Sequence, residues 1–172
     1  MQTAEMESRN SLANRAVDVL TRTLSDENVL LLKLRNYHWN VAGPHFRQLH
    51  ALFEEQYGIV ANRIDQVAER IRALGSYATG TMTEYLQRSM LREHPGSYPA
   101  AHQMLHDALK DHEAIIRFIT ESLTSSGQDI LGIGTTDLLT AVIQDHEKMA
   151  WMLRVTLSDN HEEQHWYPVM YG

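Results

Sequence analysis

The chain has 172 residues, 43% of them hydrophobic, and a formal net charge of −7. This size and composition allow one domain with a substantial core and exclude disordered and collagen-like chains. The net negative charge is unfavourable for binding nucleic acid. The absence of cysteine excludes disulfides, thiolate zinc sites and thiol catalysis. The longest aliphatic run, residues 29–32, is too short to span a bilayer, and the first ten residues show no secretory signal. We therefore expect a cytoplasmic protein that does not enter a membrane.

Four long segments carry apolar residues at the spacing of amphipathic helices: about residues 11–38, 46–74, 99–123 and 136–157. Gly43 and Pro44 end the first helix, because proline lacks an amide hydrogen and clashes with the preceding turn. Gly75 ends the second helix as a C-terminal cap, and Pro99 marks the start of the third. The glycines at 132 and 134 predict a loop before the fourth helix.

The connection between the second and third helices, residues 76–98, is long and includes a short helix candidate at 84–91. Two antiparallel helix pairs joined by a long crossover are typical of a ferritin-like four-helix bundle. We therefore predict an all-α fold with a short extra helix in the crossover. A single domain spans residues 1–172, with short flexible tails at 1–10 and 158–172.

Histidine and carboxylate side chains form two pairs in the second predicted helix. His50 and Glu54 are four residues apart, as are Asp65 and Glu69, so each pair lies on one face of the helix. His38, at the end of the first helix, adds a ligand across the turn. Nitrogen and carboxylate ligands suit iron near neutral pH and leave open positions for water and an oxidant.

One metal ion cannot bind both pairs of a single chain. His50 and Asp65 are 15 residues apart, about 22 Å along a helix, whereas metal–ligand bonds are only about 2 Å long. Either the pairs are unrelated features of a solvated helix face, or a second copy of the chain completes the site. If this helix runs antiparallel to its copy, each acidic pair faces the histidine-containing pair of the other chain. The small residues Gly58 and Ala61 near the midpoint would permit that close approach.

Residues 37–75 resemble the signature of the Dps family, the twelve-subunit miniferritins. The similarity covers these stretches: His38 to Val41, Gly43, Phe46, Leu49–His50, Phe53–Glu54 and Asp65 to Gly75. The helical pattern elsewhere agrees, so the resemblance extends from about Leu12 to Leu157.

The resemblance implies a ferroxidase centre that lies between two subunits. Its ligands would be His38, His50 and Glu54 from one subunit and Asp65 and Glu69 from the dimer mate. The protein would oxidise Fe(II) with hydrogen peroxide, or with oxygen, and deposit ferric mineral inside a hollow homo-dodecamer built from two-fold dimers. This activity would protect against oxidative damage, and zinc would be a competing occupant of the site.

Two further residues receive a role from the resemblance. Trp39 resembles a tryptophan beside the family's site, where it would capture stray oxidising equivalents; alternatively it packs the turn. Asp137 corresponds to an acid that lines the family's three-fold pore, although Ile133 replaces a second acid found there, with Asp129 as the alternative second acid. An aspartate at a helix start is also a favourable cap, which is the other interpretation of Asp137.

Ordinary ferritins and bacterioferritins are the nearest alternative. They hold two iron ions within one bundle, using Glu-x-x-His on two core helices. In this chain the one such motif, Glu162 with His165, lies in the predicted tail. The intersubunit interpretation is therefore preferred.

The remaining histidines fall into three groups. His112 and His146 lie on apolar stripes, which predicts buried, hydrogen-bonded rings, with a metal role as the alternative. His102 and His106 form an exposed pair that decorates the surface or holds zinc or copper loosely. His161 and His165 belong to the polar tail, where they could bind metal near a pore.

Two other functions remain to be distinguished from iron storage. The first is nucleoid compaction, but residues 1–10 hold one Arg against two Glu, and no Lys or Arg follows Leu157. Without such cations there is little counterion release to drive association, so DNA binding should be weak or absent. The second is a mononuclear zinc or copper protein built on the histidine pairs.

Overall fold

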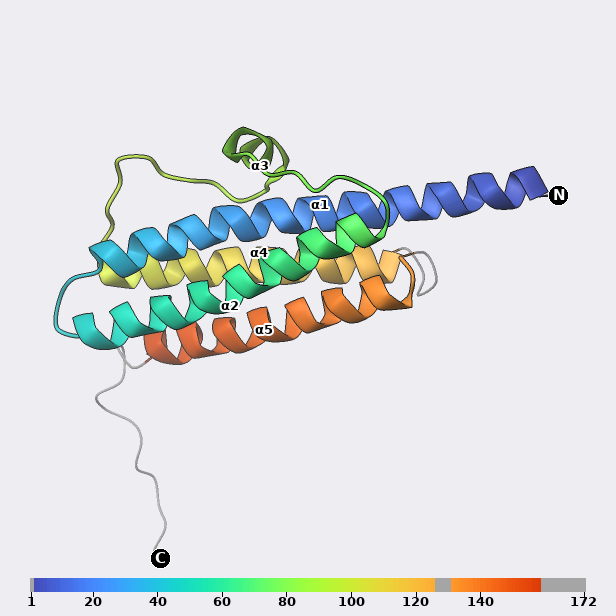
Figure 1. The fold of residues 1–172 in the computed structure, drawn as a ribbon. Coiled ribbons are helices and arrows are strands. Elements are labelled where there is room, and N and C mark those ends of the chain that lie inside the picture. The colour runs from blue at the N-terminus through green and yellow to red at the C-terminus, as the bar shows by residue number, and fades with distance from the viewer. Residues whose placement is uncertain (1, 126–130, 159–172) are drawn as a thin grey trace, which may run out of the picture.

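The computed structural model describes residues 2–125 and 131–158, with side chains from residue 14 onward. Its elements in chain order are α1 (Gln2–Asn40), α2 (Phe46–Ala73), α3 (Met82–Arg88), α4 (Ala101–Ser125) and α5 (Ile133–Ser158). Helix α1 packs against α2 and α4 against α5, each pair antiparallel, and together the four long helices form a bundle (Figure 1). The predicted all-α four-helix bundle with a short extra helix is confirmed.

The core lies along the axis of the bundle. In α2 the residues Phe53, Val60, Val67 and Ile71 form an apolar stripe at the predicted helical spacing, and all four are fully buried. Burying one such side chain contributes about 1.5–3 kcal/mol, so this stripe alone holds α2 firmly in place. None of the described helices combines the length and the hydropathy needed to cross a bilayer.

The crossover between α2 and α4 returns along α1 and carries α3, which packs on α1 (Figure 1). Asp26 of α1 anchors it: one carboxylate oxygen accepts hydrogen bonds from the Ser89 hydroxyl and the Met90 amide, both at 2.7 Å. Burial raises the pKa of the Asp26 carboxyl, and the hydrogen bond from Ser89 partly opposes that shift. The crossover is therefore fixed to the bundle just after α3 ends.

Gly75 ends α2 as predicted. Its φ of 88° lies in the left-handed region, which glycine adopts without the steric cost that other residues meet. The Gly75 amide donates to Arg72 O at 3.0 Å, and the Ser76 amide donates to Ile71 O at 3.2 Å. These two bonds satisfy the last carbonyls of the helix in the Schellman pattern.

Three predicted helix starts are too late. Helix α1 begins at Gln2 rather than Ser11, so the expected tail over residues 1–10 is wrong for Gln2–Asn10. This segment contains neither Gly nor Pro, and most of its residues are compatible with a helix. Helix α3 begins at Met82 rather than Glu84, because the side chains and amides of Thr81 and Glu84 form a reciprocal capping box.

Helix α5 begins at Ile133, three residues before the predicted start at Thr136. The carbonyl of Gly132 accepts the Thr135 and Thr136 amides at 3.0 Å each, so the helix starts directly after this glycine. Gly134 lies inside the helix, where a Cβ atom would come within 3.3 Å of the Arg70 guanidinium. The second glycine therefore serves close packing of α5 on α2. The predicted tail beyond Ser158 lies outside the described residues.

Candidate metal centre

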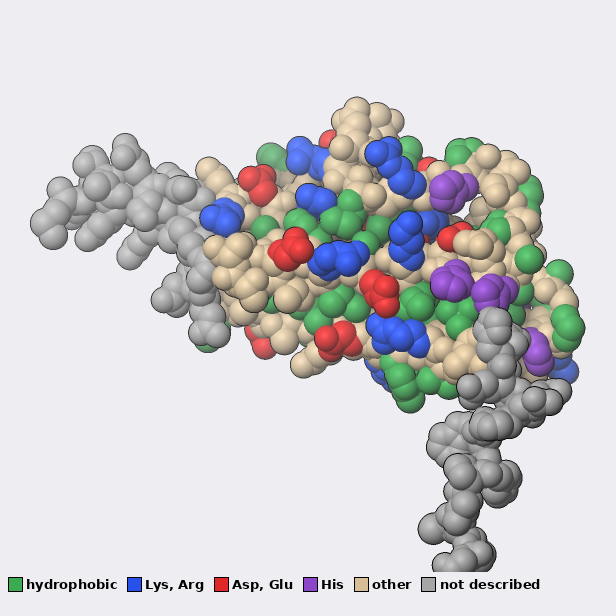
Figure 2. Space-filling view, turned by 180° about the vertical axis from the view of Figure 1, so that it is seen from behind, with side chains coloured by type: hydrophobic (Ala, Val, Ile, Leu, Met, Phe, Trp, Pro, Cys, Tyr) green, Lys and Arg blue, Asp and Glu red, His purple; other side chains and the backbone are tan. Residues whose placement is uncertain are grey.

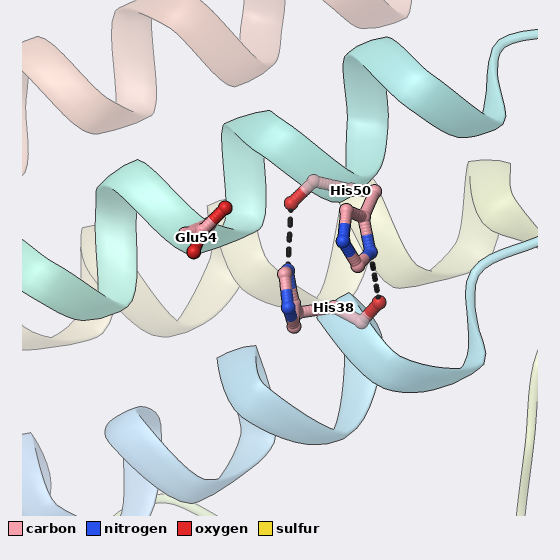
Figure 3. A group of neighbouring side chains, drawn as sticks. All are labelled: His38, His50 and Glu54. Carbon is pink, nitrogen blue, oxygen red and sulfur yellow. Dashed lines mark hydrogen bonds between the residues drawn. The ribbon is translucent and has the colours of Figure 1, made fainter.

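The turn between α1 and α2 brings three predicted ligands together. His38 lies in the last turn of α1, and His50 and Glu54 lie on successive turns near the start of α2. Gly43, with a φ of 114°, allows the chain to reverse within five residues. One potential ligand atom from each of the three side chains lies within 4.8 Å of the other two (Figure 3). This is the one such group found among the described residues.

Reciprocal hydrogen bonds hold the two imidazole rings. His38 Nδ1 is 2.8 Å from His50 O, and His50 Nδ1 is 2.8 Å from His38 O, as Figure 3 shows. A carbonyl oxygen only accepts, so each Nδ1 must carry the hydrogen. In the neutral ring, each Nε2 then has a free lone pair. Metal-binding histidines are typically fixed in this way by a partner on the second nitrogen.

The rings stack on each other with centroids 3.7 Å apart and an interplanar angle of 21°. His38 is buried, His50 is half-buried and Glu54 is exposed, so the group opens to the surface on the side of Glu54. Two histidines and one carboxylate, with positions left open for exogenous ligands, are a donor set that suits Fe(II). The chemistry of the residues therefore fits the predicted metal.

Tyr57 also contacts this group, and the sequence analysis did not identify it. Its hydroxyl donates to a Glu54 carboxylate oxygen at 3.5 Å, and its ring meets the His38 ring edge-on with centroids 5.4 Å apart. The Arg35 guanidinium lies 5.4 Å from the centre of the Tyr57 ring. The available signal was its position three residues after Glu54, which places both on one helix face.

Asp65 and Glu69 do not join the group within one chain. Both side chains are exposed on α2, beyond the midpoint of the helix from His50. Trp39, the neighbour of His38, is 67% exposed, so it does not pack the turn within this chain. The structure thus brings together three of the five predicted ligands and leaves the two acids on a surface.

The other singled-out residues occupy different places. Asp137 is exposed in the second turn of α5, so its interpretation as a helix cap is wrong. His102 and His106 are exposed on α4 with ring centroids 5.3 Å apart. His112 and His146 are fully buried and hydrogen-bonded, as predicted. Asp129, His161 and His165 lie outside the described residues.

One cavity of the bundle does not coincide with the histidine group. It has a volume of about 410 Å³ and lies between α1, the start of α4 and the crossover. Lys33 lines it and forms an ion pair with Asp111, whose carboxyl pKa is raised by burial and lowered in part by Lys33. The group of three potential metal ligands found among the described residues, His38, His50 and Glu54, does not line this cavity.

Comparison with known proteins identifies relatives over most of the chain. Residues 17–160 match the model of the ferritin-like domain. A low temperature-induced protein of Nostoc is 43% identical over 138 residues, which are 80% of this chain and 77% of the relative. The DNA protection during starvation protein 2 of Bacillus anthracis is 37% identical over 147 residues, covering 84% of this chain and 97% of the relative.

Solved structures agree with the sequence relatives. The Dps of Thermosynechococcus elongatus superposes with a TM-score of 0.81 at 32% identity, covering 87% of this chain and 94% of that one. The Dps of Vibrio cholerae, described as a member of a broad superfamily of ferritin-like diiron-carboxylate proteins, gives a TM-score of 0.78 at 28% identity, with 85% and 91% covered. The similarity therefore extends along most of each chain.

Proposed function

Because the chain belongs to the Dps family of ferritin-like proteins, we propose that it oxidises ferrous iron and stores the ferric product inside a shell of its own copies. The observation that supports this function best is the convergence of His38, His50 and Glu54 within 4.8 Å. Both histidines present a free Nε2, because their Nδ1 atoms are committed to backbone carbonyls. Iron is the substrate of this reaction and, as mineral, its stored product.

A second copy of the chain would complete the site. The group of His38, His50 and Glu54 opens to the surface on the side of Glu54. Asp65 is exposed about 22 Å from His50 along α2, and Glu69 is exposed one turn further on. In an antiparallel pair of α2 helices, the Asp65 and Glu69 carboxylates of the partner subunit would face His50 and Glu54. A two-fold dimer of this kind has two equivalent sites, and such dimers would assemble into the hollow dodecamer.

The ligand set suits oxidation of iron by peroxide. Two Fe²⁺ ions each lose one electron, hydrogen peroxide takes both electrons together with two protons, and two water molecules form. Carboxylates are hard ligands that favour the ferric product, and the histidines hold the ferrous ion before the reaction. Dioxygen is the second candidate oxidant. Zinc, which accepts the same nitrogen and oxygen ligands, would occupy the site as an inhibitor.

Trp39 would capture oxidising equivalents that escape this two-electron reaction. It follows His38 directly in the chain, and 67% of its surface is exposed in one subunit. We expect Trp39→Phe to raise the yield of spin-trapped hydroxyl radical during iron oxidation, while the rate of iron oxidation is unchanged. An unchanged radical yield would remove this role.

The decisive experiment compares the oxidation rates of two double variants. Purified shells are loaded with Fe²⁺ without oxygen, and absorbance of the ferric product is followed after peroxide is added. The double variant His50→Ala/Glu54→Ala should lose rapid oxidation, while size-exclusion chromatography shows an intact shell. The matched control is His102→Ala/His106→Ala, which alters a different pair of side chains four residues apart and should oxidise iron normally. Rapid oxidation by the first variant would refute the site.

Tight DNA binding does not fit the charge of this protein. On the face shown in Figure 2, Lys and Arg side chains alternate with Asp and Glu rather than forming a continuous basic surface. The net charge of −7 gives an overall repulsion toward phosphates. Metal-free protein should therefore give no gel shift with duplex DNA at about 0.15 M salt, where long-range attraction is screened.

A further inference from the structure

A chain of polar side chains crosses the core of the bundle. Each of the four long helices contributes one member: Glu27 from α1, Gln56 from α2, His112 from α4 and His146 from α5. All four are at most 1% exposed. Ionisable groups are rarely buried this completely unless their charges are paired. The role proposed for the metal centre uses none of these four residues.

The direction of the hydrogen bonds is fixed from one end. Gln56 Nε2 donates to the Met149 carbonyl at 3.4 Å, so its Oε1 atom is free to accept from His112 Nε2 at 3.3 Å. His112 therefore carries its hydrogen on Nε2, and in the neutral ring its Nδ1 is an acceptor. His146 Nδ1 lies 2.7 Å from this atom and must be the donor.

The last link of the chain must hold one further proton. His146 Nε2 lies 2.7 Å from Glu27 Oε1, a distance that requires a hydrogen between two atoms that otherwise both present lone pairs. The proton belongs either to an imidazolium facing a carboxylate or to a carboxylic acid facing a neutral imidazole. In both cases the group is electrically neutral as a whole. The other Glu27 oxygen has no hydrogen-bond partner, so His146 alone compensates this carboxylate.

We propose that this hydrogen-bonded chain is an acid-sensitive latch, which holds the four helices together while His112 is neutral and releases them when His112 gains a proton. A protonated His112 would point an N–H group at the N–H group of His146. It would also place an additional positive charge in a core that excludes water. The bond joining α4 to α5 would then become a repulsion.

The charged surroundings of His112 support this mechanism. Helix α1 contributes the Glu27 carboxylate, which is already engaged by His146 of α5, and α2 contributes only the neutral amide of Gln56. Asp111, next to His112 in the chain, is paired with Lys33. No carboxylate among these groups is therefore free to stabilise a positive charge on His112. Burial, followed by the proximity of His146, lowers the pKa of the His112 imidazole well below its ordinary value of 6.5.

The sign of the pH effect follows from this lowered pKa. In the unfolded chain His112 takes up a proton as the pH falls through 6.5, whereas in the folded chain it does not. The unfolded state then binds more protons, so the free energy of unfolding decreases as the pH falls below 6.5. The loss continues until the pH reaches the lowered pKa of the folded state. Above 6.5 this contribution does not vary with pH.

The first test measures proton uptake upon unfolding. Urea unfolding of metal-free wild type, His112→Gln and His94→Gln is followed between pH 5 and pH 7 at one protein concentration. Gln at position 112 keeps a donor and an acceptor but has no ring to protonate, whereas His94 is exposed on the crossover. One proton fewer changes the pH dependence of the unfolding constant by about tenfold per pH unit. We expect this flattening in His112→Gln and not in His94→Gln, whatever the absolute stability of each variant.

The second test needs no variant, so it holds even if His112→Gln fails to fold. Hydrogen–deuterium exchange at the imidazole C2 position, read peptide by peptide by mass spectrometry, reports the protonation of each histidine in the intact protein. His112 should titrate well below the ordinary imidazole value of 6.5. A His112 titration midpoint at 6.5 or above, or a His112→Gln variant with the pH slope of the wild type, would overturn the latch. Neither measurement involves iron, so the outcome is independent of the proposed ferroxidase activity.

Discussion

Two histidine pairs join helices in this molecule, and their hydrogen bonds leave them with different capacities to bind a metal ion. In the surface pair, His38 and His50, each ring commits only Nδ1, and it commits it to a backbone carbonyl. In the core pair, His112 and His146, both nitrogens of both rings are committed to other side chains. The surface pair therefore retains two free lone pairs for a metal ion, and the core pair retains none.

The comparison shows that a histidine pair can bind a metal ion only through ring nitrogens that are not already hydrogen-bonded. The presence of two histidines is not sufficient. A backbone carbonyl fixes the tautomer of His38 and His50 without consuming the second nitrogen, which is the arrangement that metal ligands require. In His146, one ring nitrogen is hydrogen-bonded to the His112 imidazole and the other to the Glu27 carboxylate. No nitrogen of His146 is therefore left to bind a metal ion. The neighbours of the two pairs are thus as informative as the histidines themselves.

The largest expected difference between the pairs is in how much free energy of unfolding the protein loses when one histidine of the pair is replaced. His146→Leu keeps the apolar volume but leaves the Glu27 carboxylate buried without a partner, which should lower the free energy of unfolding by about 3–5 kcal/mol. The corresponding change at the surface, His50→Leu, leaves Glu54 in water and should cost only about 1 kcal/mol through its lost hydrogen bond. Urea titrations of the two variants at pH 8 measure both values.

A companion variant identifies the cause of that loss. If the buried charge of Glu27 is responsible, Glu27→Leu/His146→Leu should be more stable than His146→Leu alone, because it removes the unpaired carboxylate. A double variant that is less stable than the single one would show that packing around position 146, rather than charge, dominates the core pair.

The second expected difference is in metal affinity. His50→Ala removes a free Nε2, although the His38 ring keeps its hydrogen bond to the backbone carbonyl of residue 50. Fe²⁺ should therefore bind at least about tenfold more weakly. Anaerobic equilibrium dialysis measures this change. His94→Ala is the control, because His94 is exposed on the crossover, outside the ligand group. Equal Fe²⁺ affinity in wild type and His50→Ala would remove the distinction between the two histidine pairs.

The sequence was sufficient for those parts of the fold and site that depend on local spacing. Helix periodicity placed Phe53 and Val60 in the core, and the spacing of four placed His50 and Glu54 on one face. The start of α5 was missed because Gly134 was interpreted as part of a loop, whereas close packing against Arg70 places a glycine inside the helix.

The hydrogen-bond partners were beyond sequence reasoning for a different reason. His112 and His146 were predicted to be buried, but the bond from His146 to Glu27 joins residues 119 positions apart. Periodicity states which face of a helix is buried and not which residue lies opposite. The proton between them, and hence the contrast with the surface pair, could be derived only once the four helices were placed together.

The smallest expected effect concerns the neighbour that orders the surface pair. Tyr57 donates to Glu54 and packs its ring edge-on against His38, so it joins ligands from both helices. Removing one hydrogen bond in Tyr57→Phe should cost about 1 kcal/mol of binding energy, which weakens Fe²⁺ binding about fivefold. Tyr77→Phe is the matched control, because the Tyr77 ring also lies beneath an arginine, with Arg72 at 4.6 Å, but it is 88% exposed and touches no ligand. A weaker Fe²⁺ affinity with an unchanged maximal rate would assign Tyr57 to positioning Glu54. A lower maximal rate at saturating Fe²⁺ would instead place Tyr57 in the oxidation step itself.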